Sequence, residues 1–273
     1  MNVWHPLHVG GLYRKSLAGL LLLSSACHLE LPQEVERLKA AQSQLESQNR
    51  KLQQQLVAEQ RESTRLRRLL RERSSELVAS RMGIPDPETQ LFATLKTSLG
   101  EIRIRLDWKE APYTVQNFVA LAEGARAWRD PKTGEQVRRP FYDGLTFHRV
   151  IPGFMIQTGD PKADGSGGPG YQFPDELVEG RHPDRAGWVG MANTGPDTNG
   201  SQFFILDGPA VDLEGRHTLF GEVAQGQEVV TKITQVERDK ADTPLTPVTL
   251  EKVRIERVLS TGSRDTGSDH TPR

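Results

Sequence analysis

Residues 147–160 of this 273-residue chain, FHRVIPGFMIQTGD, constrain its fold more than any other stretch. They are mostly large apolar residues, interrupted by one cation, Arg149, and one amide, Gln157. Strand-forming residues flank Pro152-Gly153, so the sequence predicts two short strands joined by a tight turn. Strand alternation should then divide the residues after the turn between two faces, Phe154 with Ile156 and Met155 with Gln157.

A second stretch, residues 190–205, has the same character. Its sequence GMANTGPDTNGSQFFI is a loop of small and polar residues that leads into an apolar strand. Together the two stretches supply an apolar pocket, one fixed positive charge and several amides. No motif gives Ser201 a histidine or carboxylate partner, so a hydrolase is disfavoured. These parts suit binding a peptide and polarising one of its bonds.

The surrounding sequence predicts a domain of many short strands over residues 91–259. Alternating runs at residues 91–98 and 101–107 are joined at Leu99-Gly100, which indicates a hairpin. Further strands are expected at residues 188–192, 202–206, 218–223 and 248–258. Helices are expected at residues 114–123, capped by Thr114, and at residues 227–235. We expect residues 126–140 to be a surface loop and residues 165–170, GSGGPG, to be a flexible one. Such a pattern is typical of an antiparallel sandwich or barrel.

Three segments carry a family resemblance: FHRVIPGFMIQTGD, MANTGPDTNGSQFFI and LEGRHTLFGEV. In wording, order and spacing they resemble the signature series of the cyclophilin-type peptidyl-prolyl cis-trans isomerases, and the similarity covers about residues 91–259. The resemblance implies a closed eight-stranded antiparallel β-barrel capped by two α-helices. It also implies an enzyme that accelerates rotation about X-Pro bonds in proline-containing polypeptides, with no cofactor and no metal.

The resemblance assigns roles to individual side chains. Arg149 would direct its guanidinium at the prolyl nitrogen, although an arginine in a strand is more often part of a surface ion pair. The expected substrate-binding residues are Phe154, Met155, Gln157, Ala192, Asn193, Gln202, Phe204, Leu213 and His217. Without the resemblance, the apolar members of this set would more often be core residues. The chain departs from the family at Asp212, where many cyclophilins carry Trp, so we expect a negative charge at the pocket rim and weakened cyclosporin binding.

A different class of function is a non-catalytic envelope scaffold or chaperone that only holds proline-containing loops. Such a protein would not need Arg149 together with the full set of pocket residues. We therefore favour the isomerase. His148 falls on the opposite face of its strand from Arg149, and we expect it to be a packing residue without a role in proton transfer.

The first 27 residues have the pattern of an export signal. Arg14-Lys15 precede an apolar run at residues 16–26. Such a run reaches only about 16 Å as a helix, too short to span a bilayer. The residues SSAC, ending at Cys27, resemble a bacterial lipobox, although Ser24 departs from its usual leucine. We expect a lipoprotein, exported to the cell envelope, anchored in a membrane through lipidated Cys27 and facing the periplasm. The alternative is an ordinary cleaved signal and a soluble periplasmic or secreted protein.

Residues 28–82 predict a long coiled-coil helix. Between residues 33 and 82 there is no Gly and no aromatic residue, and heptad a and d positions can be assigned from Val35 onward. Thirteen a and d positions lie between Val35 and Leu77. Eight of them are apolar: Val35, Leu38, Leu45, Leu52, Leu56, Leu66, Leu70 and Leu77. Asn49 at an a position would favour a dimer in fixed register, so we expect self-association through residues 33–82. The alternative is a lone solvated helix stabilised by ion pairs.

Turn residues and composition indicate the boundaries of the remaining segments. Gly83 and the prolines at 85 and 87 should end the helix and make residues 83–90 a linker, whereas residues 260–273 are polar and expected to be disordered.

The charge is distributed unevenly along the chain. Residues 33–82 carry 11 Lys/Arg against 7 Asp/Glu, and residues 83–273 carry 22 against 28. A mildly acidic domain argues against nucleic acid as a partner. A single cysteine excludes an intrachain disulfide, and the seven histidines lack metal-ligand spacing.

Overall fold

The computed structural model describes residues 24–259, and of residues 24–32, 67 and 71 it describes only the backbone. The chain divides into two compact units, residues 1–66 and residues 67–273. The expected signal segment up to residue 23 and the expected disordered tail lie outside the described residues. Cys27 lies within the described backbone, but its side chain is outside the description.

The first described element is the helix α1, Ser24–Arg81, which forms the described part of the first unit and begins the second. Its residues between 33 and 82 are rich in Leu, Gln, Glu and Arg, all good helix formers. The helix ends at Arg81, close to where the sequence predicts. It is followed by the predicted turn residue Gly83, whose φ is +65°. The Ile84 N–H donates to the Ala79 carbonyl at 2.9 Å and the Gly83 N–H to Ser80 at 3.3 Å. These two bonds form a Schellman C-cap.

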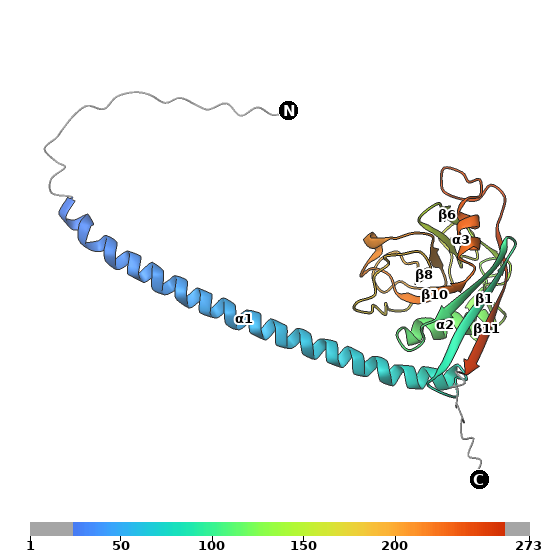
Figure 1. The fold of residues 1–273 in the computed structure, drawn as a ribbon, viewed down its shortest axis with the longest axis horizontal. Coiled ribbons are helices and arrows are strands. Elements are labelled where there is room, and N and C mark those ends of the chain that lie inside the picture. Colours follow the sequence, from blue (N-terminus) through green and yellow to red (C-terminus); the bar gives the residue numbers. More distant parts are fainter. Residues whose placement is uncertain (1–23, 260–273) are drawn as a thin grey trace, which may run out of the picture. The chain divides into compact units, whose positions relative to one another are not determined.

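The second unit is built on a nine-stranded antiparallel sheet with the order β5-β11-β1-β2-β10-β8-β9-β7-β6. Its strands, in chain order, are β1 (Thr89–Thr97), β2 (Gly100–Leu106), β5 (Leu145–Thr146), β6 (Arg149–Ile151), β7 (Met155–Thr158), β8 (Trp188–Met191), β9 (Phe203–Leu206), β10 (Leu219–Gln225) and β11 (Thr249–Leu259). Long ladders join β1 to β2 and to β11, and these strands lie side by side in Figure 1. The predicted hairpins and strands are therefore confirmed to within one or two residues.

The closed eight-stranded barrel that we expected is wrong. The sheet has nine strands and is open, because no ladder joins its edge strands β5 and β6. Both edges come from one short piece of chain, residues 145–151, which is interrupted at Phe147-His148. Its first part pairs with β11 and its second part with β7. The edges are thus connected by covalent chain, and a strand cannot form a ladder with its own continuation.

Two helices accompany the sheet, α2 (Pro112–Ala122) and α3 (Gln227–Thr234), and a short 3-10 turn, η1, covers Val211–Leu213. Both helices were expected, but Thr114 does not cap α2. The helix begins two residues earlier, and the carboxylate of Glu176 accepts the N–H groups of Tyr113 and Thr114 at 3.1 and 2.7 Å. A carboxylate 62 residues beyond Thr114 therefore satisfies the helix N-terminus, which no local pattern could indicate.

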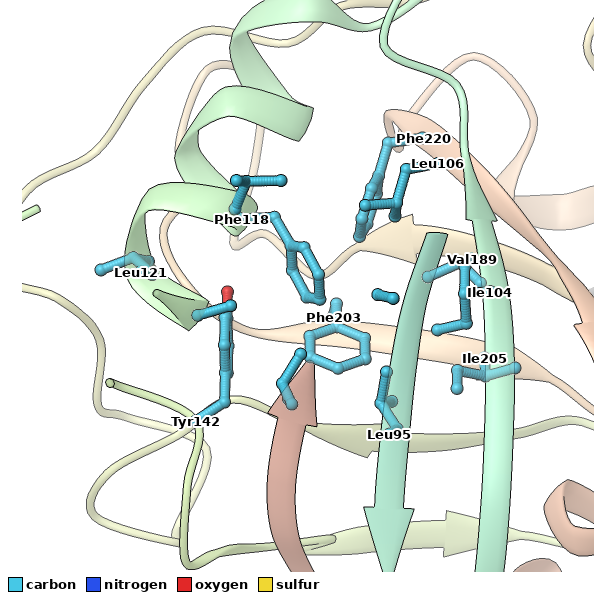
Figure 2. Packing of buried hydrophobic residues seen from close by; sticks show 14 of the residues in the cluster. Leu95, Ile104, Leu106, Phe118, Leu121, Tyr142, Val189, Phe203, Ile205 and Phe220 are labelled. Carbon is cyan, nitrogen blue, oxygen red and sulfur yellow. The ribbon is translucent and has the colours of Figure 1, made fainter. Parts of the chain in front are cut away.

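The core fills the space between α2 and the sheet with large apolar side chains (Figure 2). Phe118 on α2 contacts the rings of Tyr142, Phe203 and Phe220, with ring centroids 5.0, 5.4 and 5.5 Å apart. All four rings are at most 1% exposed. Burying each such side chain contributes about 1.5–3 kcal/mol, so this aromatic cluster fixes α2 on the sheet and holds β9 in place beside the candidate site.

The segment after α2 is more ordered than the surface loop that we expected at residues 126–140. It contains a two-stranded ladder between β3 (Trp128–Arg129) and β4 (Gln136–Val137). Trp128 is buried, and its indole N–H donates to the Arg139 carbonyl at 3.1 Å. One buried aromatic residue thus attaches this charged segment to the core.

The last turns of α1 and residues 82–84 belong to the second unit and contribute to its core. Val78, Met82 and Ile84 belong to its main apolar cluster, with exposed fractions of 0, 5 and 7%. The Arg257 guanidinium donates to the Met82 carbonyl at 2.8 Å. The compact unit therefore begins within the helix, at Arg67, and includes residues 83–90 that we expected to be a linker. No helix within residues 24–259 is both long and apolar enough to cross a membrane.

Candidate active site

The Pro152-Gly153 turn joins β6 to β7 and sets the register of the site. Arg149 on β6 lies directly opposite Gln157 on β7. Gly153 has a φ of +69°, which a glycine adopts without strain, and its N–H donates to the Asp207 carboxylate at 3.1 Å. The hydroxyls of Thr231 and Thr234 on α3 also donate to Asp207, so one carboxylate holds the turn against the helix.

A pocket of about 800 Å³ lies beside this hairpin. Four pieces of chain line it: the β6-β7 hairpin, the glycine-rich loop at residues 165–172, residues 192–204, and the segment around η1. Every residue assigned to the site from the sequence lines this pocket: Arg149, Phe154, Met155, Gln157, Ala192, Asn193, Gln202, Phe204, Leu213 and His217. Segments separated by more than 60 residues therefore meet in one cavity.

The apolar residues of the pocket belong to a small cluster that is separate from the main core. Met155, Phe204, Leu206 and Leu219 are buried members, and Phe154 and Leu213 pack against them. The predicted alternation is wrong for Phe154, which lies in the turn before β7 begins and faces the pocket with Met155, whereas Ile156 belongs to the core. This cluster gives the pocket a surface on which a ring the size of proline can be buried.

Gly190, the first residue of the second stretch singled out in the sequence, makes room for this surface. A Cβ on Gly190 would lie 2.4 Å from the Phe204 ring, so any larger residue there would displace the ring. The Phe204 ring also lies against His217, with ring centroids 5.5 Å apart and nearly perpendicular rings. His217 Nδ1 lies 2.9 Å from the Met191 carbonyl, which can only accept, so Nδ1 is the protonated nitrogen.

The amide side chains form a chain of hydrogen bonds along one wall. Gln157 Nε2 donates to Gln202 Oε1 at 2.9 Å, and Gln202 Nε2 donates to the carbonyls of Gly165 and Gly167 at 2.9 and 2.8 Å. The glycine-rich loop that we expected to be flexible is therefore tied to the wall of the pocket. Buried Asp160 secures it further by accepting the N–H groups of Lys162, Asp164 and Gly165.

The side-chain amide of Asn193 makes its hydrogen bonds within the protein. Its Nδ2 donates to the Arg216 carbonyl at 2.9 Å and lies 3.5 Å from the Asp175 carboxylate. Its side-chain amide N–H groups therefore bind inside the protein, and a contact from Asn193 to a substrate would use another atom. Asp212, at the position of the departure from the family, is exposed on η1 beside Leu213 and is not among the residues that line the pocket.

The charged and titratable groups near the hairpin are few. The Arg149 side chain is 46% exposed, and its Nε lies 3.7 Å from the Asp242 carboxylate. His148 is buried, and neither ring nitrogen makes a hydrogen bond of good geometry within residues 24–259, although the Gln202 side chain lies near the imidazole. Burial lowers the pKa of His148, an effect that the carboxylates of Asp160 and Asp164 partly oppose.

The pocket offers cation and amide chemistry rather than a nucleophile. Ser201 is buried, and its hydroxyl donates to the Gly159 carbonyl at 2.7 Å. Among the described residues, no group of three or more His, Cys, Asp or Glu side chains is placed to bind a metal ion. A guanidinium at the edge of a half-apolar cavity can bind and polarise a neutral group, such as an amide.

Comparisons with known proteins agree with this geometry. Residues 92–255 match the family model for "Cyclophilin type peptidyl-prolyl cis-trans isomerase/CLD". Peptidyl-prolyl cis-trans isomerase B of Streptomyces anulatus is 50% identical over 174 residues, which cover 61% of this chain and 97% of that protein. Peptidyl-prolyl cis-trans isomerase A of Mycobacterium tuberculosis is 48% identical over 171 residues, covering 62% of this chain and 94% of that protein.

A solved structure shows the same fold. It is a crystal structure of a Cryptosporidium parvum cyclophilin-type peptidyl-prolyl cis-trans isomerase in the presence of the dipeptide Ala-Pro. The TM-score is 0.53 and the sequence identity is 29%, and the match covers 60% of this chain and 98% of that one. The family match begins after α1, so the helix must be explained separately.

Proposed function

This chain belongs to the cyclophilin-type peptidyl-prolyl cis-trans isomerase family, and from this membership we propose that Arg149 is the group that accelerates rotation about X-Pro bonds. The activity itself, isomerisation of peptidyl-prolyl bonds, is that of the family and of the relatives that the chain matches over nearly their whole length. The assignment of Arg149 and of the substrate contacts is our inference from the geometry of the pocket.

The reaction is slow because the amide C–N bond has partial double-bond character. Its barrier to rotation is about 18–20 kcal/mol, and uncatalysed X-Pro isomerisation takes tens to hundreds of seconds. Twisting the bond localises the lone pair on the prolyl nitrogen. A guanidinium N–H that donates to this nitrogen stabilises the twisted form more than the planar one, which is the requirement for catalysis.

The energies required are modest. A 10⁴-fold acceleration corresponds to about 5.5 kcal/mol of transition-state stabilisation. A hydrogen bond from a charged donor contributes about 1.5–3 kcal/mol, and an apolar surround with positioned substrate can add the remainder. No cofactor and no metal take part in this mechanism.

The observation that supports this proposal is the position of Arg149 in a pocket with an apolar surface. Arg149, the Phe154–Met155 pair and Phe204 line the same cavity. Proline would bury its ring against the apolar cluster, and the guanidinium would contact the imide nitrogen. The Cryptosporidium parvum relative was crystallised in the presence of Ala-Pro, which supports proline-containing polypeptides as substrates of this chain.

Replacing the guanidinium tests the proposal. We expect Arg149→Ala to lower kcat/KM at least about tenfold, which corresponds to about 1.4 kcal/mol, without a change in the thermal midpoint. Arg254→Ala, which removes an exposed arginine from β11, is the matched control and should keep wild-type activity. Wild-type turnover in Arg149→Ala would show that another group is catalytic.

The proposal extends to the compartment. Residues 14–27 have the order of a basic, apolar and small-residue export signal that ends at Cys27, which supports an exported, lipid-anchored enzyme facing the periplasm that assists folding of envelope proteins. Mass analysis of the mature chain tests this directly. We expect a diacylated N-terminal Cys27 and release of the protein from the membrane fraction in Cys27→Ser. A mature chain with an unmodified N-terminus would instead mean a soluble exported protein, and an uncleaved chain would rule out export by this signal.

Self-association through α1 is the last part of the proposal. The eight apolar a and d positions identified from Val35 to Leu77 are all exposed, with fractions from 45 to 68%. These eight side chains form an exposed apolar row along one face of α1. Burying this row against a second helix would stabilise the assembly. The expected assembly is a dimer, because Asn49 occupies an a position within this row.

A further inference from the structure

We propose that Asp242 is a positioning residue for Arg149 and that it sets the orientation from which the guanidinium meets the substrate. The inference rests on the proposed catalytic role of Arg149. Asp242 lies far from Arg149 along the chain, on the connection between α3 and β11, and no sequence motif of the site includes it.

The contact between the two residues uses one edge of the guanidinium. Asp242 Oδ2 lies 3.7 Å from Arg149 Nε, and it is the one carboxylate paired with Arg149 within residues 24–259. Because the contact is at Nε, the two terminal nitrogens are left for another acceptor. A carboxylate in this place restricts the long arginine side chain while keeping its outer N–H groups available to a substrate.

The backbone around Asp242 is fixed to the same strand. The Asp242 carbonyl accepts the N–H of Val150, the residue after Arg149, at 2.8 Å. Asp242 itself has a φ of +65°, in the left-handed region that aspartate and asparagine tolerate better than most residues. Its own N–H donates to the Asp239 carbonyl, and the Asp239 side chain accepts the N–H groups of Ala241 and Thr243 at 2.8 and 2.9 Å.

This arrangement contributes little to folding stability. The side chains of Arg149 and Asp242 are 46 and 32% exposed, and exposed ion pairs of this length add little to stability. In a catalytic pocket, however, a displacement of a reacting group by about 1 Å can lower the rate strongly. The pair therefore has more effect on the position of the guanidinium than on the stability of the fold.

Asp242 has a second partner, and this offers a control. Arg238 Nε lies 3.3 Å from Asp242 Oδ1, so loss of the carboxylate also frees Arg238. If Asp242 acted only by holding its loop, removing Arg238 would disturb the site equally. If it acts on Arg149, Arg238→Gln should leave catalysis nearly unchanged.

The test is a double-mutant cycle on the full chain. Asp242→Asn keeps the size and the left-handed backbone of the residue and removes only the charge. We expect it to lower kcat/KM about three- to tenfold with an unchanged thermal midpoint, to have no effect in an Arg149→Ala background, and to shift the ¹⁵N resonance of Arg149 Nε. Arg238→Gln should keep wild-type kcat/KM and leave the ¹⁵N resonance of Arg149 Nε unshifted.

The outcomes separate this inference from the proposed function. If Arg149→Ala lowers kcat/KM as expected and Asp242→Asn has wild-type or higher kcat/KM, the positioning role is overturned and the catalytic role of Arg149 stands. If Asp242→Asn lowers kcat/KM equally with and without Arg149, or if Arg238→Gln has the same effect, the carboxylate acts on the loop and the inference is again overturned. Wild-type activity in Arg149→Ala would remove the premise itself.

Discussion

His148, next to Arg149, is a buried imidazole beside a candidate catalytic group. It is 6% exposed, and among the described residues its ring nitrogens make no hydrogen bond of good geometry, although Gln202 lies near them. Burial lowers the pKa of its imidazole, the carboxylates of Asp160 and Asp164 oppose the shift, and the charge of Arg149 adds to it. The folded protein therefore holds His148 neutral at pH values where an exposed histidine is protonated.

A pH dependence of stability follows from this lowered pKa. An unfolded histidine has a pKa near 6.5, so below about pH 6.5 the unfolded chain binds a proton that folded His148 does not. Stability should decrease as the pH falls from about 6.5 through the lower pKa of the folded state. We expect His148→Gln to have a smaller decrease in thermal midpoint between about pH 7.5 and about pH 5.5 than the wild type. All other titrating groups are common to both proteins, so equal decreases would show that His148 does not titrate in this way.

The pocket residues illustrate what the sequence could predict at the scale of single side chains. Phe154, Gln202 and His217 lie in recognisable motifs, and the structure brings all of them to one cavity. The packing role of Gly190 and the contact made by Asp242 were not predicted, for a physical reason. Their roles depend on a ring from the neighbouring strand β9 and on an arginine from β6, and neither contact has a local pattern.

At the scale of secondary-structure elements, the end of α1 is part of the second unit, residues 67–273, which we call the isomerase unit. Ser75 is buried and its hydroxyl donates to the Lys109 carbonyl at 3.0 Å, one turn before Val78 enters the main core. The helix thus has two environments along its length. Its last turns are packed by tertiary contacts, whereas its earlier apolar side chains are exposed.

Two neighbouring residues of α1 provide a matched test of this packing. Val78 is fully buried, and Leu77 is 53% exposed. We expect Val78→Ala to lower the free energy of unfolding of the isomerase unit by about 2 kcal/mol, from lost burial and a partly unfilled cavity. Measured at concentrations low enough for the chain to be a monomer, Leu77→Ala should change this free energy by less than about 0.5 kcal/mol. Chemical denaturation monitored by tryptophan fluorescence measures both, and equal effects would mean that this part of α1 is not docked.

Strand positions were well predicted from the sequence because alternation is a local property. Residues 248–258 alternate strongly, and β11 occupies nearly the same residues. Elements defined by distant partners were predicted less well. The start of α2 depends on Glu176, and the open edges of the sheet depend on how residues 145–151 divide between two neighbouring strands. The family resemblance implied a closed barrel, but it did not indicate that residues 145–151 divide between two neighbouring strands.

At the scale of the whole molecule, composition placed the domain boundary too late. The change from a charged helix to an apolar, glycine-containing sequence occurs near Gly83. The compact unit starts at Arg67, because side chains such as Val78 and Met82 bury themselves in the domain. A change in composition marks where the types of residue change. The boundary of a compact unit depends instead on which side chains are buried in that unit.

The exposed row on α1 leads to a prediction about assembly. Leu45 and Leu52 occupy successive d positions and are 58 and 60% exposed. A second copy of the helix would cover both, and Asn49 between them would fix the register of the pair. We expect the chain without its signal segment to sediment as a dimer at micromolar concentrations, and the Leu45→Lys/Leu52→Lys variant to sediment as a monomer, because two buried, unpaired charges oppose association.

The matched control places the same charges outside the row. Ser47 and Gln54 occupy successive f positions of the same heptads, which face away from a partner helix. Ser47→Lys/Gln54→Lys should therefore remain a dimer, with helicity equal to that of the variant with altered leucines. A monomeric wild-type chain would mean that α1 acts alone as a solvated helix, and dissociation of the control would show that net charge, rather than the leucine row, determines assembly. In each protein the kcat/KM per chain should be unchanged, because the pocket is formed entirely by residues of one isomerase unit.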